Sequence, residues 1–271
     1  MGDSLEFGVS FVDPVRVRWA DDPEKVDSYV GRLGPGDQKE AHFMFWSHTR
    51  EQFTLEEDPP RADPCLKYGK PEKIPDGELR LMAERQGRTV LSGYRVTVTV
   101  RERGGDQQFD LGPFRREVRW KSNAVKEPIK AHVQGIVIGE VRAHVRDNPD
   151  EPRLDMKLIR PDRPQIHKLS LETDNPRVQV ALDESSCDIL KVEILNDKEG
   201  KKEVLAGGAV LKRWDVNVSF RPESQFRGRF PDLERPGYES TAIVFKITHA
   251  GAMNEPLRRL RVLVRGQVES R

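Results

Sequence analysis

The sequence repeats itself at an interval of about 126 residues, and this repeat constrains the fold more than any other feature. Trp19–Glu24 aligns with Val145–Asp150, and with small gaps Tyr94–Val98 aligns with Trp214–Val218. A repeat this long indicates two copies of a domain rather than the short units of a solenoid. Residues or segments that occur in only one copy are therefore not required by the shared fold.

Most apolar residues alternate with polar ones, which is typical of β-strands with one buried face. The alternating segments of the first copy, and then their counterparts in the second, are residues 41–46, 94–100 and 129–133, and residues 166–171, 214–220 and 260–264. The pattern predicts two antiparallel β-sandwiches. Only residues 77–83 favour a helix, and we expect a turn or two there.

The repeat also predicts the domain boundaries. We expect residues 22–146 to form the first copy and residues 147–271 the second, with Asp147–Pro152 as the linker. Within residues 1–21, Leu5–Val12 resembles the strand that closes each copy. Residues 1–21 are therefore predicted to be the closing strand of an upstream repeat or an extra strand, which implies a longer tandem array.

Composition excludes several classes of function. A net charge of +1 gives no general reason to expect a nucleic-acid partner. No apolar run approaches the ~20 residues that span a bilayer, so membrane insertion is not expected. Residues 1–20 lack the basic start and the apolar stretch of a signal peptide. The two Cys, Cys65 and Cys187, fall at equivalent places in different copies, which excludes a disulfide within one copy.

Four motifs stand out in the two copies, namely Gly31–Asp37, Ser185–Asp188, Gly93–Val98 and Pro128–Val137. Together they resemble a bacterial domain-of-unknown-function family of Ig-like β-sandwich repeats, related to hydin-like (abnormal-spindle-type) domains. The family's second Cys is Lys67 in the first copy and Ile189 in the second. The resemblance implies two tandem Ig-like sandwiches that serve as a binding module or a spacer and not as an enzyme. It also implies a periplasmic or cell-surface location.

No residue pattern predicts a catalytic centre, a cofactor site or a metal site. Cys65 and Cys187 have acidic neighbours in the sequence and are expected to be inert, partly buried thiols. The six His form no short-spaced ligand pair, and we expect them to face solvent from strands. They are His42, His48, His132, His144, His167 and His249.

Four acidic segments have alternative interpretations. The paired carboxylates of Glu56–Asp58 and Asp183–Glu184 are expected to lie in solvated turns rather than in a catalytic cleft. The segments Asp21–Glu24 and Asp147–Glu151 place several oxygen donors at the expected domain junctions. They are either soluble spacers or calcium sites that stiffen an array, and the sequence leaves both open.

Basic and aromatic residues supply the remaining candidates for binding. Arg115–Lys121 and Arg258–Arg265 alternate with apolar residues, so we expect solvated strand faces, with a polyanion-binding face as the alternative. The loop around residues 225–233 occurs only in the second copy. Its Phe226, Arg227, Arg229 and Phe230 are the predicted protein-binding residues, because aromatic and Arg side chains dominate interface energies.

The sequence thus predicts a non-catalytic tandem module, a spacer and protein-binding platform within a larger exported or surface-associated protein. Its partners would be an unidentified protein and adjacent repeats of the parent chain. The alternative is a carbohydrate-binding module, which needs an exposed aromatic platform. Trp46, Trp120 and Trp214 are the only candidates for that platform.

Overall fold

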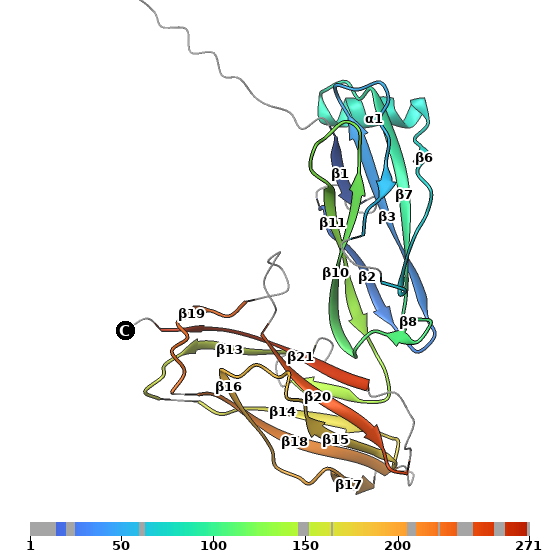
Figure 1. The fold of residues 1–271 in the computed structure, drawn as a ribbon. Coiled ribbons are helices and arrows are strands. Elements are labelled where there is room, and N and C mark those ends of the chain that lie inside the picture. Colours follow the sequence, from blue (N-terminus) through green and yellow to red (C-terminus); the bar gives the residue numbers. More distant parts are fainter. Residues whose placement is uncertain are drawn as a thin grey trace, which may run out of the picture. The chain divides into compact units, whose positions relative to one another are not determined.

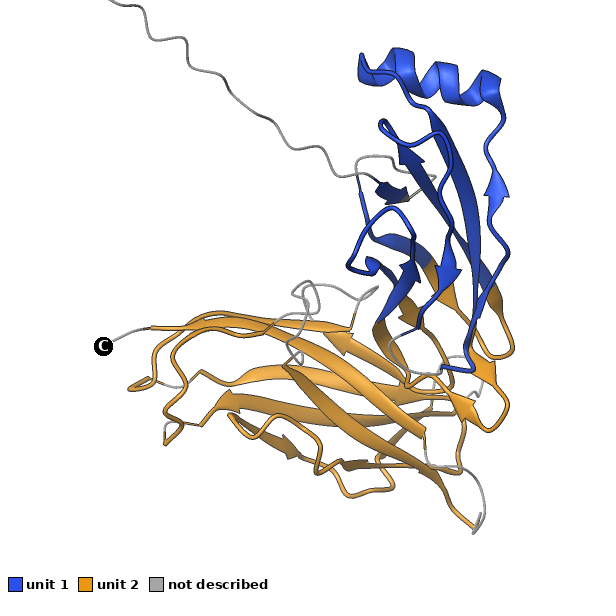
Figure 2. Cartoon of the chain, turned by 45° about the horizontal axis from the view of Figure 1, so that its top comes forward, with its two compact units in different colours: residues 1–30, 39–100, 116–133 blue, residues 31–38, 101–115, 134–271 orange. Residues whose placement is uncertain are grey.

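The computed structural model is built almost entirely of strands (Figure 1). It describes residues 15–19, 25–59, 63–145, 152–163, 165–204, 210–221, 223–231, 241–251 and 258–269. The chain divides into two compact units, shown in Figure 2. Unit 1 comprises residues 1–30, 39–100 and 116–133, and unit 2 comprises residues 31–38, 101–115 and 134–271.

The strands of the first copy form two sheets. One sheet has the order β1 (Arg16–Trp19), β3 (Gln38–Ser47), β7 (Ser92–Arg101) and β5 (Leu66–Tyr68), with β6 (Glu72–Lys73) also paired to β7. The other has the order β2 (Ser28–Leu33), β11 (Ile129–Val137), β10 (Gly112–Lys121) and β4 (Glu56–Glu57). A small hairpin, β8 (Arg103–Gly104) and β9 (Gln107–Gln108), follows β7.

The second copy has the same strand order. Its first sheet runs β12 (Arg142–Val145), β14 (His167–Thr173), β18 (Val210–Phe220) and β16 (Leu190–Ile194), with β17 (Lys201–Val204) also paired to β18. Its second sheet runs β13 (Arg153–Ile159), β21 (Arg258–Val268), β20 (Ala242–His249) and β15 (Val178–Leu182), with β19 (Gly228–Arg229) also paired to β21.

This strand order confirms the prediction of Ig-like β-sandwiches. In an immunoglobulin domain the first, second, fifth and fourth strands make one sheet, and the third, sixth and seventh make the other. Both copies follow this order, with the first strand divided between the two sheets. The register repeats as well, because Trp19 pairs with Phe43 in one copy and Val145 pairs with Leu169 in the other.

The strand pairings bear on the ends of the repeats. Residues 16–19 pair with β3, and β12 pairs with β14 although it precedes residue 147, where the second copy was expected to begin. Leu5–Val12, Asp21–Glu24 and residues 147–151 lie outside the described part of the chain. The domain boundaries, the upstream repeat and the calcium alternative therefore stay predictions.

Large aromatic side chains fill the cores. In unit 1 the Trp120 ring lies 5.3 Å from Phe43, 4.8 Å from Phe45 and 5.7 Å from Tyr68, measured between ring centroids. In unit 2 the indole nitrogen of Trp214 donates a hydrogen bond to the Lys198 carbonyl at 3.2 Å. Both Trp side chains are fully buried.

Candidate functional site

Among the residues that the structure describes, a helix occurs in the first copy and none occurs in the second. α1 (Asp76–Gln86) lies between β6 and β7, in the segment 74–91, whereas only residues 205–209 join the corresponding strands β17 and β18. The helix begins after Pro75, has Asp76 and Glu78 in its first turn, and ends at Gly87 in the left-handed conformation. The helix is longer than the turn or two expected from the sequence. The sequence pattern underestimates its length because few of its residues are apolar.

α1 packs against the outer face of β3. Leu79, the buried residue of the helix, joins a cluster with Met44, Trp46, Ile74 and Val90, and Met82 and Ala83 pack at its edge. The sequence itself indicates that the outer face of β3 is covered. Residues 41–46 were expected to alternate, but residues 43–46 are apolar at every position, so both faces of that strand need burial, whereas the matching residues 169–172 do alternate.

Gly93 permits the close approach of the helix. A Cβ atom at this position would lie 3.0 Å from both Ile74 Cδ1 and Leu79 Cδ2, and 3.1 Å from the Phe45 carbonyl oxygen. By the sequence alignment the second copy has Arg213 at this place, and its side chain pairs with Glu172 and Asp215. One small residue thus makes room for an additional element on one copy only.

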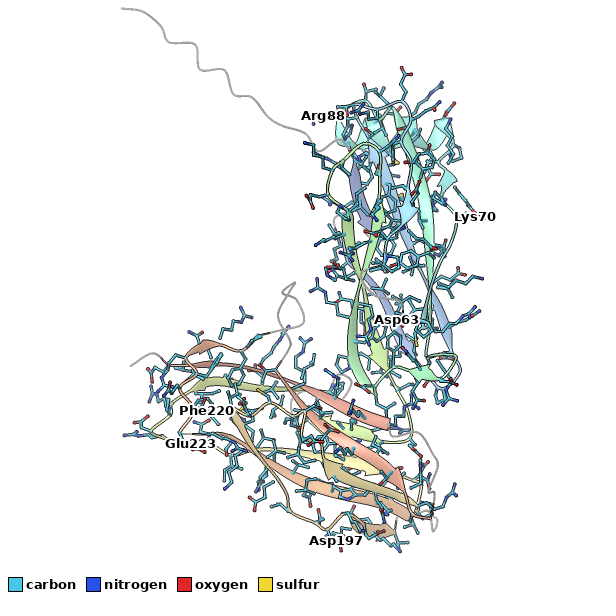
Figure 3. All side chains as sticks on the ribbon, viewed as in Figure 1. Asp63, Lys70, Arg88, Asp197, Phe220 and Glu223 are labelled. Atoms are coloured by element: carbon cyan, nitrogen blue, oxygen red, sulfur yellow. The ribbon has the colours of Figure 1, made fainter. Side chains whose placement is uncertain are left out.

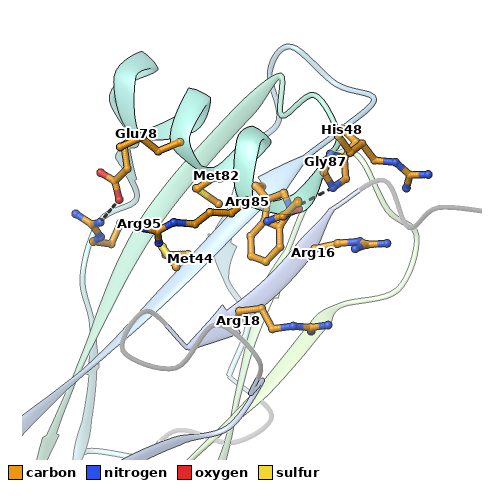
Figure 4. A pocket seen from close by; sticks show the side chains of 13 residues that line it. Arg16, Arg18, Met44, His48, Glu78, Met82, Arg85, Gly87 and Arg95 are labelled. Atoms are coloured by element: carbon orange, nitrogen blue, oxygen red, sulfur yellow. Dashed lines mark hydrogen bonds and ion pairs between the residues drawn. The ribbon is translucent and has the colours of Figure 1, made fainter.

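A groove of about 900 Å³ lies between α1 and the sheet (Figure 4). Its volume falls in the range of ligand-binding pockets. The lining includes five arginines and one carboxylate, namely Arg16, Arg18, Arg85, Arg88, Arg95 and Glu78. Arg95 Nη2 lies 2.6 Å from Glu78 Oε1, so one cation is paired within the groove. Four guanidinium groups remain in excess of the carboxylates that line it.

The groove also has an apolar part. Met44 and Trp46 are buried beneath it, Met82 is half-buried, and Leu81 is 54% exposed. Trp46 Nε1 donates to His48 Nε2 at 3.3 Å, and His48 Nδ1 lies 2.6 Å from the Thr89 carbonyl oxygen. Because Nε2 accepts from Trp46, the proton of a neutral His48 sits on Nδ1 and points to Thr89. These bonds fix the end of the groove near the last turn of α1.

The same sheet face of the second copy is polar and balanced in charge. Arg142 and His144 occupy the register positions of Arg16 and Arg18, and Glu172 and Ser170 occupy those of Trp46 and Met44. His144 Nε2 lies 3.1 Å from Glu172 Oε2, and Arg213 contacts both Glu172 and Asp215. The excess of positive charge in the groove is therefore not a requirement of the fold.

The predicted protein-binding residues of the second copy divide into two pairs. Phe230 is buried, and the Phe226 ring lies 5.5 Å from it and is half-buried. The Phe230 amide donates to the Gly266 carbonyl oxygen at 2.9 Å, which ties the loop to β21. Arg227 and Arg229 are exposed. The two aromatic rings thus anchor the loop, and the two arginines remain exposed to solvent.

Trp46, Trp120 and Trp214 do not form the aromatic platform that a carbohydrate-binding module needs. Trp46 is 4% exposed, Trp120 is 1% exposed and Trp214 is fully buried. The ring faces are therefore unavailable for stacking on a sugar. The three Trp side chains therefore give no support to the carbohydrate-binding alternative.

The two basic strand segments are largely neutralised by carboxylates. Arg116 pairs with Asp63, Arg119 with Glu117 and Lys121 with Asp58. In unit 2, Arg258 pairs with Glu102, Arg259 with Asp183 and Arg261 with Asp110. Cations that already have partners are weak attractors for a polyanion. The groove differs from both segments in this respect.

Several titratable residues differ from the sequence predictions. Asp183 was expected in a solvated turn and is instead 1% exposed, because Ser185 and Arg259 bind its carboxylate. Burial alone would raise the pKa of Asp183, but these hydrogen bonds outweigh it and hold the pKa at about 2. His132 was expected to face solvent and instead lies 3.0 Å from Asp27 with 13% of its side chain exposed.

The thiols lie much as expected. Cys65 is buried and Cys187 is half-buried, and burial raises the pKa of the Cys187 thiol. Among the described residues no group of three or more His, Cys, Asp or Glu side chains is placed to hold a metal ion. In the same part of the chain, no helix has the length and apolar character to cross a bilayer.

Comparison with known proteins finds likeness in structure alone. No protein-family model and no curated protein matches the chain. A protein of unknown function from Porphyromonas gingivalis W83 is similar at 12% identity and a TM-score of 0.34, covering 94% of this chain and 99% of its own. The titin fragment A168169 is similar at 9% identity and a TM-score of 0.27, and the match covers 94% of this chain and 99% of the fragment.

A third similar structure is the sialic acid binding region of an adhesin from Streptococcus sanguinis SK1. It has 10% identity and a TM-score of 0.26, and the match covers 93% of this chain and 78% of that one. The Ig-like assignment rests on the strand order of the two copies and not on these likenesses. The resemblance to hydin-like repeats stays a prediction.

Proposed function

We propose that this chain is a non-catalytic tandem module, a spacer and protein-binding platform within a larger exported or surface-associated protein. The observation that carries the proposal is the contrast between a shared scaffold and differing additions. Both copies keep one strand order and one register, while, within the described part of the chain, α1 occurs only in the first and the loop of residues 225–231 only in the second. Rigid sandwiches that display different loops are typical of binding scaffolds.

The exported or surface location rests on the family resemblance and is part of the proposal. The spacer role follows from the repeat, since tandem sandwiches add length without adding chemistry. The binding role follows from the exposed arginines and Leu81 on the two additions, because Arg and apolar side chains are favoured at interfaces.

Site-specific photo-crosslinking in the cells that make the parent protein tests the binding role. A photoreactive amino acid is placed at Leu81, at Arg227 or at Arg229, and at Val204, which is 75% exposed on β17, as the control. Adducts with another protein from the first three positions and none from Val204 support the proposal. Absence of adducts from all three positions in surface-displayed protein overturns it.

A further inference from the structure

We propose that the groove beneath α1 binds an acidic peptide segment that carries an aliphatic anchor residue. The inference deepens the proposed function and rests on it, because it names the chemistry of the partner. The partner segment would place carboxylates on the arginines of β1 and α1 and one aliphatic side chain against Leu81 and Met82.

The charge of the groove selects an anion. Within the described part of the chain, the side chains of Arg16, Arg85 and Arg88 have no carboxylate in contact, and Arg18 donates only to the Val17 carbonyl oxygen at 2.9 Å. Arg88 is exposed at the end of α1 (Figure 3). Guanidinium groups bind carboxylates through two parallel hydrogen bonds, which fits a peptide rich in Asp and Glu.

The helix end does not cancel this charge. The C-terminus of α1 faces the groove through Gln86 and Gly87, and its dipole contributes about half a negative charge. Arg85, in the last turn, offsets that dipole. Arg16 and Arg18, which come from β1, still leave the groove positive.

The apolar part of the groove selects a peptide among anions. A sugar or a nucleobase would need an open aromatic face on which to stack, and Trp46 is 4% exposed. Leu81 and Met82 offer an aliphatic and thioether surface, which suits a Leu, Ile or Met side chain. Acidic residues around one aliphatic anchor therefore match the groove better than a glycan or a nucleic acid does.

The test measures binding of a fluorescein-labelled peptide with the repeating sequence Glu-Asp-Leu to the full chain, by fluorescence anisotropy. Replacing Arg16 and Arg88 together by Gln should weaken binding about tenfold or more, since hydrogen bonds between charged groups are the strong ones. Raising the salt concentration to about 1 M should also weaken it, because screening then acts within about 3 Å. A peptide with Ser in place of Leu should bind more weakly to the unaltered chain.

Two variants serve as matched controls. Arg142→Gln changes the register equivalent of Arg16 in the second copy, and Arg80→Gln changes an exposed arginine of α1 that does not line the groove. Both should bind the peptide as the unaltered chain does. All variants should keep the melting temperature of the unaltered chain, because the replaced side chains lie outside the cores.

Four results would overturn the inference. They are an equal loss with Arg142→Gln, no binding at all, tighter binding of a heparin oligosaccharide or an oligonucleotide than of the peptide, and binding that appears only when Asp21, Asp22 and Glu24 are replaced by Asn, Asn and Gln. The last result would assign the groove to the chain's own acidic segment. If crosslinks still form through Arg227 or Arg229, only this inference fails, whereas their absence at every position overturns the proposed function itself.

Discussion

At the scale of single residues, Asp183 is the carboxylate whose environment departs most from its sequence context. It follows β15, its neighbour Glu184 is 92% exposed, and nothing in the local sequence distinguishes the two. The groups that bury and bind Asp183 include Arg259, which lies far along the chain on β21. Sequence reasoning could not place that partner, so it predicted a solvated turn.

This carboxylate should contribute stability that depends on pH. Its pKa falls from 3.8 to about 2 on folding, so the unfolded chain binds more protons between these values. The contribution, about 2 kcal/mol, is complete above pH ~4 and is lost as the pH falls towards ~2. We expect Asp183→Asn to lower the free energy of unfolding by about 2 kcal/mol at pH 7. The variant should also lose less stability than the unaltered chain as the pH falls from ~4 to ~2.

Urea unfolding of the chain between neutral and acid pH would measure both effects. Glu184→Gln is the matched control, since it removes the adjacent, exposed carboxylate. The assignment is wrong if the two variants lose stability equally, or if Asp183→Asn keeps the full acid dependence of the unaltered chain.

The two thiols should react slowly in the folded chain. Cys65 is 2% exposed, and the half-buried Cys187 has a raised pKa because burial disfavours its thiolate. We expect a colorimetric thiol reagent to modify Cys187 faster than Cys65, and both to react rapidly once the chain is unfolded. Rapid modification of Cys65 under native conditions would contradict the burial described here.

At the scale of elements, the strands follow from the sequence and the helix follows only in part. Buried residues alternate with more exposed ones along β18 and, from Val96 onward, along β7, so the period of these strands could be predicted. α1 exposes most of its surface, and it is held by contacts with Met44, Trp46 and Val90 from outside the helix. Its length depends on those tertiary contacts, which a local pattern does not contain.

The closeness of α1 to the sheet can be tested at two glycines. Gly93→Ala should lower the free energy of unfolding by about 1–3 kcal/mol, because the new methyl group would press on Ile74 and Leu79. Gly77→Ala should instead raise it by up to about 1 kcal/mol, because a Cβ there has nothing within 4 Å and the helix gains propensity. Thermal unfolding of both variants checks the pair, and equal effects would refute the close packing.

At the scale of the whole molecule, the repeat predicted the architecture and left the boundaries open. Identical strand order was implied by the aligned strands, but the short strand β12 gave no signal of its pairing with β14. Glu140 contacts His249 at 2.9 Å and Asn175 at 2.9 Å, and it too precedes residue 147. These contacts join residues far apart in sequence, so no local pattern reveals them.

Two fragments should therefore differ in stability. Residues 147–271 are predicted to fold cooperatively with a β-type circular dichroism spectrum, and residues 138–271 should be more stable by about 3 kcal/mol or more. The longer fragment adds the buried Val141 and Val145 and the contacts of Glu140. Chemical unfolding of both would decide the boundary, and equal stability would place it at residue 147.

The pairing of β13 with β21 has a mechanical consequence for a chain under tension. The two strands are parallel, with Arg153 opposite Leu263 and Ile159 opposite Val268. Pulling on the start of β13 and the end of β21 therefore draws the strands past each other along their length, and all hydrogen bonds of the pair resist together. Antiparallel strands pulled from neighbouring ends would open one bond at a time. In single-molecule pulling the second copy should therefore break at high force in one step.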